Sequence, residues 1–421
     1  MPADLSPSRM SLQIAEQARR LNEQMMKNRR PLAPRKPPTD NCTMTIPAPS
    51  VRARDPLRSV TTIVIKLGSQ LLSGIDGRLD CDLMSSIAGQ IAALRQRRLH
   101  VTMVSSGAIA AGVAELKLPR RPTDLAILQA VAAVGQRRLM DAWASAFAPL
   151  KMPVAQLLLT REDVDDRARY LNVRNTITAA HELGAVPIIN ENDTISTAEL
   201  ARITFGDNDI LAAHVAHALR ADLLVLLSVV DGILDGDGRP VRTVAKVDDV
   251  RELVRAQKSA AGKGGFTSKL EAARMIAGSG EMLIVADGRM PDLLPRLLDG
   301  EEIGTLFCPM RKKRSARSRW IGSVRPAGAM IVDAGAARAL ADKNKSLLPA
   351  GIVAVRGAFS RGDVVAIETE TGEAIARGLT NYSAADVERI RGRRTQEVRT
   401  ILAEEAFDEV VHRDHLVLEG D

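Results

Sequence analysis

Six short runs of apolar, largely β-branched residues alternate with alanine-rich stretches in the first three quarters of the sequence. Continuous apolar runs between helical segments are typical of strands buried on both faces of a mainly parallel sheet. We therefore predict an α/β domain built as a three-layer αβα sandwich, with helices on both faces of the sheet. The six predicted strands are residues 61–66, 100–104, 153–159, 185–190, 222–228 and 282–286.

A different pattern begins after Pro326. Short alternating segments at residues 352–357, 363–369 and 373–380 are broken by glycines, which predicts a small, twisted, half-buried β-rich domain. The segment before it carries seven Lys and Arg residues and is interpreted as a basic linker. We place the boundaries at 1–58 (N-terminal extension), 59–309 (α/β domain), 310–325 (linker), 326–410 (β-rich domain) and 411–421 (C-terminal tail).

The N-terminal extension is crowded with prolines at residues 31–56. Proline removes a backbone donor and disfavours helix in the residue before it, so we expect this segment to be disordered. No apolar run reaches the roughly 18 residues of a membrane span, and no secretion signal opens the chain. Three widely spaced cysteines support neither a metal cluster nor a disulfide framework. We therefore expect a cytoplasmic protein.

Polar residues directly follow several predicted strands, where parallel sheets bind ligands. No GxxxxGK[ST] or GxGxxG motif is present, which excludes a P-loop and a dinucleotide-binding Rossmann site. A lysine such as Lys66, at the end of a strand, is most often simply solvated, so the neighbouring positions have to be weighed together. The residues at these strand ends are Lys66, Leu67, Gly68 and Ser69; Ser105, Ser106, Gly107 and Ala108; Asn190, Glu191, Asn192 and Asp193; and Ser228.

A glycine-rich segment, GKGGFTSK at residues 262–269, precedes a predicted helix. Its glycines let the backbone approach an anion, and the helix N-terminus contributes oriented N–H groups with a partial positive charge. Glycine-rich loops before helices are also often plain connections. The candidates for phosphate binding here are Lys263, Gly264, Gly265, Phe266, Thr267, Ser268 and Lys269.

The sequence GDND at residues 206–209 opens another predicted helix. Two carboxylates at this spacing can be an N-cap and a first-turn charge without further function. Alternatively, Asp209 holds Lys66 and Lys269 in position while Asp207 and Asn208 address a substrate. The spacing alone does not distinguish these interpretations.

Taken together, the segments resemble the glutamate 5-kinase branch of the amino acid kinase family. The matching motifs run in order over residues 60–415 and end in a segment similar to a PUA domain, a β-rich module first known from RNA-modifying enzymes. Other amino acid kinases would share the sandwich but do not usually carry a PUA domain. The motifs include VIKLGS (64–69), SSGAIAAG (105–112), AAVGQ (132–136), VPIINENDT (186–194), FGDND (205–209), GKGGFTSK (262–269) and SLLPAGIVAVRGAFSRGDVV (346–365).

The resemblance implies ATP-dependent phosphorylation of the γ-carboxylate of L-glutamate to L-glutamyl 5-phosphate, the first step of proline biosynthesis. Lys66 and Lys269 would be the cations on the transferring phosphoryl group, and Asp209 would organise them. Mg²⁺ would be bound through the ATP phosphates. Feedback inhibition by proline and assembly into homodimers or homotetramers are implied by the resemblance alone. Glutamate would be contacted by Ser106, Gly107, Asp193, Asn208 and Asp207, and ATP by Lys66, Gly68, Ser69, Ser228, Val229 and residues 263–269.

The residue types suit this reaction. A glutamate side chain has a pKa of about 4.3, so the attacking carboxylate is already ionised at neutral pH and no general base is needed. The obstacle is repulsion between that carboxylate and a triphosphate, which lysines, Mg²⁺ and backbone N–H groups reduce. Motifs rich in Lys and Gly, without His, are what such a reaction predicts.

Two observations leave room for other functions. Several positions depart from the family pattern: Val229 replaces a usual aspartate, and Gln70, Leu234, Lys263 and Phe266 also differ, so a noncatalytic regulatory homologue is one alternative. RNA binding through the PUA module and the basic linker is another. Against RNA binding, residues 326–421 hold 12 Lys and Arg against 16 Asp and Glu, and aromatic residues for base stacking are few.

Overall fold

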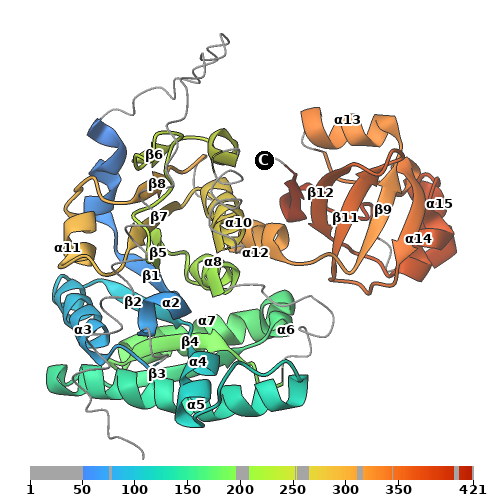
Figure 1. Ribbon diagram of the computed structural model, residues 1–421. Coiled ribbons are helices and arrows are strands. Elements are labelled where there is room, and N and C mark those ends of the chain that lie inside the picture. Colours follow the sequence, from blue (N-terminus) through green and yellow to red (C-terminus); the bar gives the residue numbers. More distant parts are fainter. Residues whose placement is uncertain are drawn as a thin grey trace, which may run out of the picture. The chain divides into compact units, whose positions relative to one another are not determined.

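The computed structural model describes residues 51–74, 78–195, 208–251, 253, 265–310, 316–343, 345–402 and 407–419. These residues form an eight-stranded sheet and a five-stranded sheet, which belong to the α/β domain and the C-terminal β-rich domain (Figure 1). The expected disorder of residues 1–50 concerns a segment outside the described residues. None of the described helices is long and apolar enough to cross a membrane.

The larger sheet has the strand order β3-β4-β2-β1-β5-β7-β8-β6. Neighbouring strands from β3 to β7 run parallel, whereas β8 runs antiparallel to β7 and parallel to β6. The prediction of a mainly parallel sheet is confirmed, and each of the six predicted strands lies within one residue of its expected position. The strands are β1 (Thr62–Leu67), β2 (His100–Ser105), β3 (Val154–Leu159), β4 (Val186–Glu191), β5 (Leu223–Ser228), β6 (Thr243–Val244), β7 (Met282–Asp287) and β8 (Thr305–Phe307).

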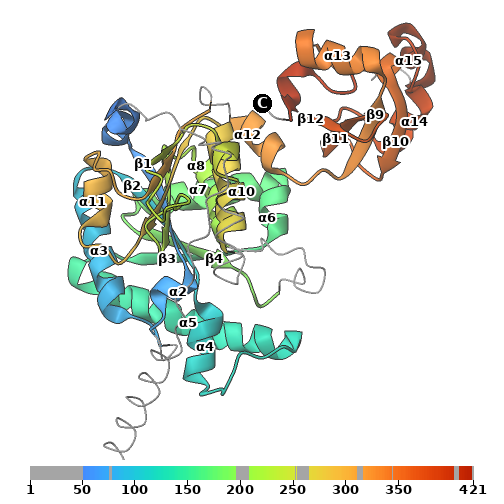
Figure 2. The same ribbon diagram turned by 45° about the horizontal axis from the view of Figure 1, so that its top comes forward.

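Helices cover both faces of this sheet. Successive side chains of a strand point to opposite faces, so a strand that is apolar throughout has apolar side chains to bury on both. In β1, Ile63 and Ile65 pack with one apolar cluster, while Val64 between them packs with another. Figure 2 shows α3 and α11 on one side of the strands and α8 and α10 on the other. The first cluster includes α3 (Cys81–Gln96), α5 (Leu125–Phe147) and α11 (Leu293–Leu298); the second includes α7 (Arg167–Glu182), α8 (Asn208–Leu219) and α10 (Gly265–Gly278).

Three shorter helices follow strand ends of the α/β domain: α2 (Ser69–Leu72), α4 (Ala108–Glu115) and α6 (Arg161–Asp165). Helix α4 packs closely against α5 at two glycines. A Cβ atom at Gly135 would lie 1.8 Å from the carbonyl oxygen of Ala108, and one at Gly112 would lie 2.0 Å from that of Val131. The two helix backbones can approach this closely only because these positions lack side chains.

We expect Gly135→Ala to destabilise the protein by at least about 1–3 kcal/mol, the usual range for overpacking, because the new methyl group forces α4 away from α5. Gly89→Ala in α3 is the matched control, since a Cβ there meets no atom within 4 Å. That control should be neutral or slightly stabilising, as alanine favours helix over glycine. Urea unfolding curves of both variants test the prediction, and equal effects would contradict it.

The N-terminal boundary differs from the expected one. Residues Val51–Ser59 form a 3-10 helix, η1, in which Leu57 is buried in the core of the α/β domain. The guanidinium of Arg54 is also buried and donates to the carbonyl oxygens of Glu301 and Ile303 at 2.7 and 2.9 Å. This segment therefore belongs to the α/β domain rather than to the extension, because Arg54 and Leu57 are buried there.

The expected basic linker also differs. Residues Ala316–Ser323 form helix α12, in which Trp320 is buried and donates from Nε1 to the carbonyl oxygen of Val164 at 3.2 Å. Arg319 is buried too and forms an ion pair with Glu281, the residue before β7. This part of the linker is thus a packed helix of the α/β core. Residues 311–315 lie outside the described residues.

The smaller sheet has the order β10-β9-β11-β12-β13, antiparallel except for the pair β9 and β11. Three of its strands match the predicted segments, but β9 and β13 were not predicted. Because β13 pairs with β12, residues 416–418 of the expected tail are part of the sheet. The elements are β9 (Gly328–Val332), β10 (Ile352–Gly357), β11 (Val364–Thr369), β12 (Ala374–Leu379), β13 (Leu416–Leu418), α13 (Ala334–Lys343), α14 (Ala384–Ile390) and α15 (Thr395–Leu402).

Candidate active site

Two lysines from distant parts of the chain meet on one carboxylate. Lys66 Nζ lies 2.8 Å from Asp209 Oδ1, and Lys269 Nζ lies 3.0 Å from Asp209 Oδ2. The exposed fractions of Lys66, Asp209 and Lys269 are 3%, 0% and 9%. Since two ammonium groups share a single carboxylate, the cluster carries net positive charge in a poorly solvated place. Such an arrangement suits an anionic ligand.

The fold brings these groups together from three elements. Lys66 is near the end of the central strand β1. Asp209 lies in the first turn of α8 and Lys269 is the fifth residue of α10, and the two helices pack on the same face of the sheet. The partial positive charge of the α8 N-terminus also favours a carboxylate in its first turn. Ser268 adds a hydroxyl that donates to Asp209 Oδ2 at 3.1 Å.

The electrostatics of Asp209 combine opposing effects. Burial raises the pKa of its carboxyl group, but attraction and hydrogen bonding from Lys66 and Lys269 outweigh burial, so that the pKa lies below the usual value of 3.8. The carboxylate is therefore ionised at neutral pH. It can hold both ammonium groups in fixed positions.

A chain of hydrogen bonds lies beside this cluster. Asn208 Nδ2 donates to Ser106 Oγ and to Asn190 Oδ1, each at 2.8 Å, and Asn190 Nδ2 donates to Gln136 Oε1 at 2.8 Å. The sequence had singled out Ser106 and Asn190 at strand ends and Asn208 in the GDND motif. Gln136 stood there only as the last residue of the motif AAVGQ.

Of the candidate glycines at the ends of β1 and β2, Gly107 lies at a position that favours glycine. Gly107 has φ 109°, a left-handed conformation, where it caps the N-terminus of α4. The amide of Gly68 donates to the carbonyl oxygen of Leu227 at 3.3 Å. A Cβ atom on Gly68 would lie 3.7 Å from Lys66 Nζ, so the glycine leaves space beside that ammonium group.

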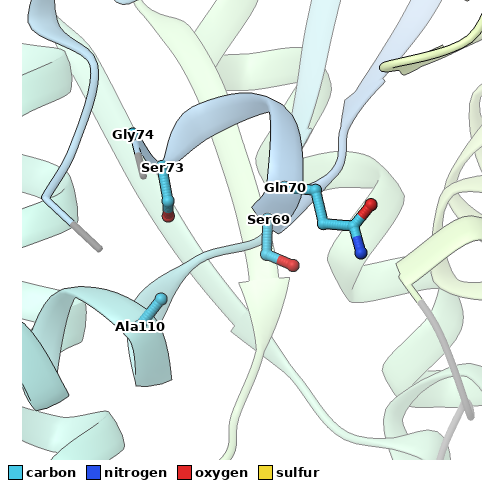
Figure 3. Close-up of a pocket in the computed structure, with 5 residues that line it drawn as sticks. All are labelled: Ser69, Gln70, Ser73, Gly74 and Ala110. Atoms are coloured by element: carbon cyan, nitrogen blue, oxygen red, sulfur yellow. The ribbon is translucent and has the colours of Figure 1, made fainter. Parts of the chain in front are cut away.

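A cavity of about 360 Å³ lies between α2 and α4. Figure 3 shows Ser69 and Gln70 on α2 and Ala110 on α4 facing this space. Both helices begin where β1 and β2 end, so the cavity adjoins the carboxyl edge of the sheet. Ser69 and Gln70, which the sequence analysis named, belong to its lining, whereas the lysine cluster does not. The lining residues are Ser69, Gln70, Ser73, Gly74 and Ala110.

A third group of residues surrounds the end of β5. Ser228, its last residue, lies opposite Asp287 of β7. Arg289 Nη2 donates to the carbonyl oxygen of Val229 at 2.8 Å and to Asp287 Oδ2 at 2.6 Å. Burial raises the pKa of Asp287, but the hydrogen bonds from Arg289 outweigh it, so the pKa lies below 3.8. Arg289 was not among the residues singled out from the sequence. Its guanidinium lies beside Val229, the position where the family usually has an aspartate.

The other candidates are placed less centrally. Asp193 lies in the turn that follows β4, Gly265 is the first residue of α10, Phe266 packs against the apolar cluster of α8, and Thr267 is exposed. Asp207, Lys263 and Gly264 lie outside the described residues. Within the described part of the chain, no group of three or more His, Cys, Asp or Glu side chains could hold a metal ion.

Comparisons with known proteins find two family models and many relatives that match this chain. The amino acid kinase family model matches residues 61–287, and the PUA domain model matches residues 328–402. Proteins named glutamate 5-kinase from Thermus thermophilus and Syntrophotalea carbinolica are 45% and 43% identical to this chain over 370 and 373 residues. These alignments cover 86% and 87% of this chain and 98% and 99% of the two relatives.

Proposed function

The chain belongs to the amino acid kinase family, and from that premise we propose that it transfers the γ-phosphoryl group of ATP to the side-chain carboxylate of L-glutamate. The product would be L-glutamyl 5-phosphate. The observation that carries the proposal is the buried Lys66–Asp209–Lys269 cluster, in which two ammonium groups converge on one carboxylate. The identity of over 40% to glutamate 5-kinases along most of the chain supports the choice of substrate.

The chemistry requires neutralisation of charge rather than removal of a proton. A glutamate carboxylate is already ionised at neutral pH, so the barrier comes from bringing it against a triphosphate. Lys66 and Lys269 would contact the transferring phosphoryl group, whose oxygens carry the negative charge of the transition state. Asp209 would keep the two ammonium groups at a fixed separation, because its two oxygens each hold one of them.

Mg²⁺ fits this site as a partner of the nucleotide. The described residues provide no side-chain cluster for a metal, and Mg²⁺ commonly binds through substrate phosphates with few protein ligands. Bound in that way, the ion would neutralise part of the phosphate charge. We propose that Mg²⁺ enters with ATP and that the two lysines act beside it.

The remaining candidates divide between the two substrates. Ser106 and Asn208 would contact glutamate, together with Gly107, Asp193 and Asp207, and Asp193 would accept from the α-ammonium group. The nucleotide would be contacted by Gly68, Ser69, Ser228, Val229, Lys263, Gly264, Gly265, Phe266, Thr267 and Ser268. We also propose that the enzyme works in the cytoplasm in the first step of proline biosynthesis, as a homodimer or homotetramer inhibited by proline.

The test is ATP-dependent formation of glutamyl hydroxamate, with aspartate and N-acetylglutamate in parallel. We expect kcat/KM for glutamate to exceed that for either other acid by at least about 10²-fold. A site built to hydrogen-bond its substrate rejects an analogue that leaves buried polar groups of the site unpaired. A preference for another acid would contradict the proposed substrate. Absence of product with every acid would favour the noncatalytic alternative, and salt-resistant binding of tRNA would favour the RNA-binding one.

A further inference from the structure

We propose that Gln136 is a positioning residue for glutamate, and that, together with the backbone amide of Glu191, it sets the direction of the hydrogen-bond chain through Asn190 and Asn208 to Ser106. With that direction set, Ser106 presents a donor to a substrate carboxylate and Asn208 presents an acceptor to an ammonium group. This inference rests on the proposed function. It adds a residue that makes no contact with the reacting atoms.

The first step is the orientation of Asn190. Its Nδ2 donates to Gln136 Oε1 at 2.8 Å, and both residues are buried, with exposed fractions of 3% and 8%. An amide side chain has its donors at one end and its acceptor at the other. The bond to Gln136 and the bond from the amide of Glu191 to Asn190 Oδ1, at 2.9 Å, therefore fix the same orientation, in which Oδ1 also accepts from Asn208 Nδ2 at 2.8 Å.

The second step is the orientation of Asn208 and Ser106. Both hydrogen bonds of the Asn208 side chain leave from Nδ2, so its Oδ1 is turned away from Asn190 and Ser106. Because Ser106 Oγ accepts from Asn208, the hydroxyl hydrogen is directed to another partner. The pair therefore offers one donor and one acceptor at the carboxyl edge of the sheet. A free amino acid, with a carboxylate and an ammonium group, has the complementary pattern.

The third step is the rigidity of the helix that carries Gln136. The neighbouring Gly135 lets α5 close onto α4, the helix that follows Ser106 and Gly107. Trp143, seven residues further along α5 and hence on the same helix face, donates from Nε1 to Ser105 Oγ at 3.0 Å. Helix α5 is thus hydrogen-bonded to the end of β2 through Trp143 and to β4 through Gln136. Because the helix is held at both points, the side chain of Gln136 stays in place to accept from Asn190.

The experiment compares Gln136→Met with Gln136→Glu. Methionine has a similar shape but offers no comparable acceptor, so Asn190 keeps its bond from the amide of Glu191 and loses the one that held its Nδ2. We expect KM for glutamate to rise about 10–100-fold. KM for ATP should stay within about twofold. Glutamate at position 136 retains an acceptor for Asn190 Nδ2 and should keep KM for glutamate within about fivefold of the parent value. Arg137→Met is the control, since Arg137 lies on the same helix with its side chain 83% exposed.

A second readout uses glutarate, which lacks the α-ammonium group. If Gln136 keeps the Asn208 acceptor in place, Gln136→Met should reduce the preference for glutamate over glutarate, and Arg137→Met should leave it unchanged. Thermal midpoints of all variants are measured alongside. The inference would be overturned if Gln136→Met and Gln136→Glu were equally impaired. It would also be overturned if Gln136→Met raised KM for glutamate and KM for glutarate by the same factor. Absence of activity in the parent enzyme would instead overturn the proposed function.

Discussion

The Asp209→Asn enzyme should lose at least about 10³-fold in kcat, the largest effect that we expect from a single substitution. The change removes the only negative charge of the Lys66–Asp209–Lys269 cluster while keeping the shape of the side chain. Two buried ammonium groups then repel each other and lose the positions that the carboxylate gave them. Loss of one preorganised charge-stabilising group usually costs about 10²–10³-fold, and here two lysines are displaced together.

The measurement is kcat and KM for both substrates, with circular dichroism to verify folding. Asp141→Asn makes the same chemical change at an exposed ion pair with Arg137 at 3.6 Å and should leave kcat within about twofold. The double variant Asp209→Asn/Lys269→Met removes the repulsion but lacks one cation, so it should recover stability and remain inactive. A kcat for Asp209→Asn within tenfold of the parent value would rule out the assigned role.

The pH dependence of Asp209 follows from the direction of its shift. Its folded-state pKa lies below 3.8, so the unfolded state binds the proton more tightly. The contribution of this carboxylate to stability is therefore present at neutral pH and above the unfolded pKa. It is lost as the pH falls through the lower, folded-state pKa.

The second large effect should be on stability. We expect Glu281→Gln to lower the free energy of unfolding by about 3–5 kcal/mol, because it leaves the guanidinium of Arg319 as an uncompensated buried charge. Glu281 and Arg319 are 2% and 1% exposed. Nε and Nη2 of Arg319 have no hydrogen-bond partner among the described residues, so its pairing with Glu281 offsets most of the cost of burial.

Urea unfolding followed by tryptophan fluorescence measures this effect, since both tryptophans of the chain, Trp143 and Trp320, are buried in the α/β domain. Asp299→Asn is the control: it neutralises the partner of Arg97 in a surface ion pair of 2.8 Å and should cost less than about 1 kcal/mol. The double variant Arg319→Met/Glu281→Leu should recover most of the lost stability. A loss for Glu281→Gln no larger than for Asp299→Asn would contradict the prediction.

Short segments whose partners are far away in the sequence were harder to predict than the main strands. Each long buried strand is recognisable because its residues are apolar at both alternating positions. The strands β6 and β13 have only two and three residues, too few to show any period, and they exist because a longer neighbour pairs with them. The basic composition of the linker similarly concealed α12, because Arg319 is buried only where Glu281 is available to pair with it.

In the candidate site, too, residues within local motifs were recognisable from the sequence, whereas contacts between distant residues were not. Lys66, Asp209 and Lys269 were found from motifs, but the contacts of Gln136 and Arg289 were not. Gln136 ends the motif AAVGQ, but its contact depends on Asn190, 54 residues further along the chain. Arg289 likewise contacts the carbonyl of Val229 from 60 residues away.

The sequence by itself determined the α/β class, the positions of the main strands along the chain and the residue types that gather at their carboxyl ends, because hydrophobic period and local backbone preference act over a few residues. Only the tertiary structure decided the order of the strands in the sheet, that one carboxylate holds both lysines and which way the amide of Asn190 points. It also decided that Arg54 and Leu57, before the first strand, and Arg319 and Trp320, in the expected linker, are buried in the α/β domain. Hydrogen bonds and ion pairs depend on distance and direction between groups far apart in the chain, which local sequence patterns do not specify.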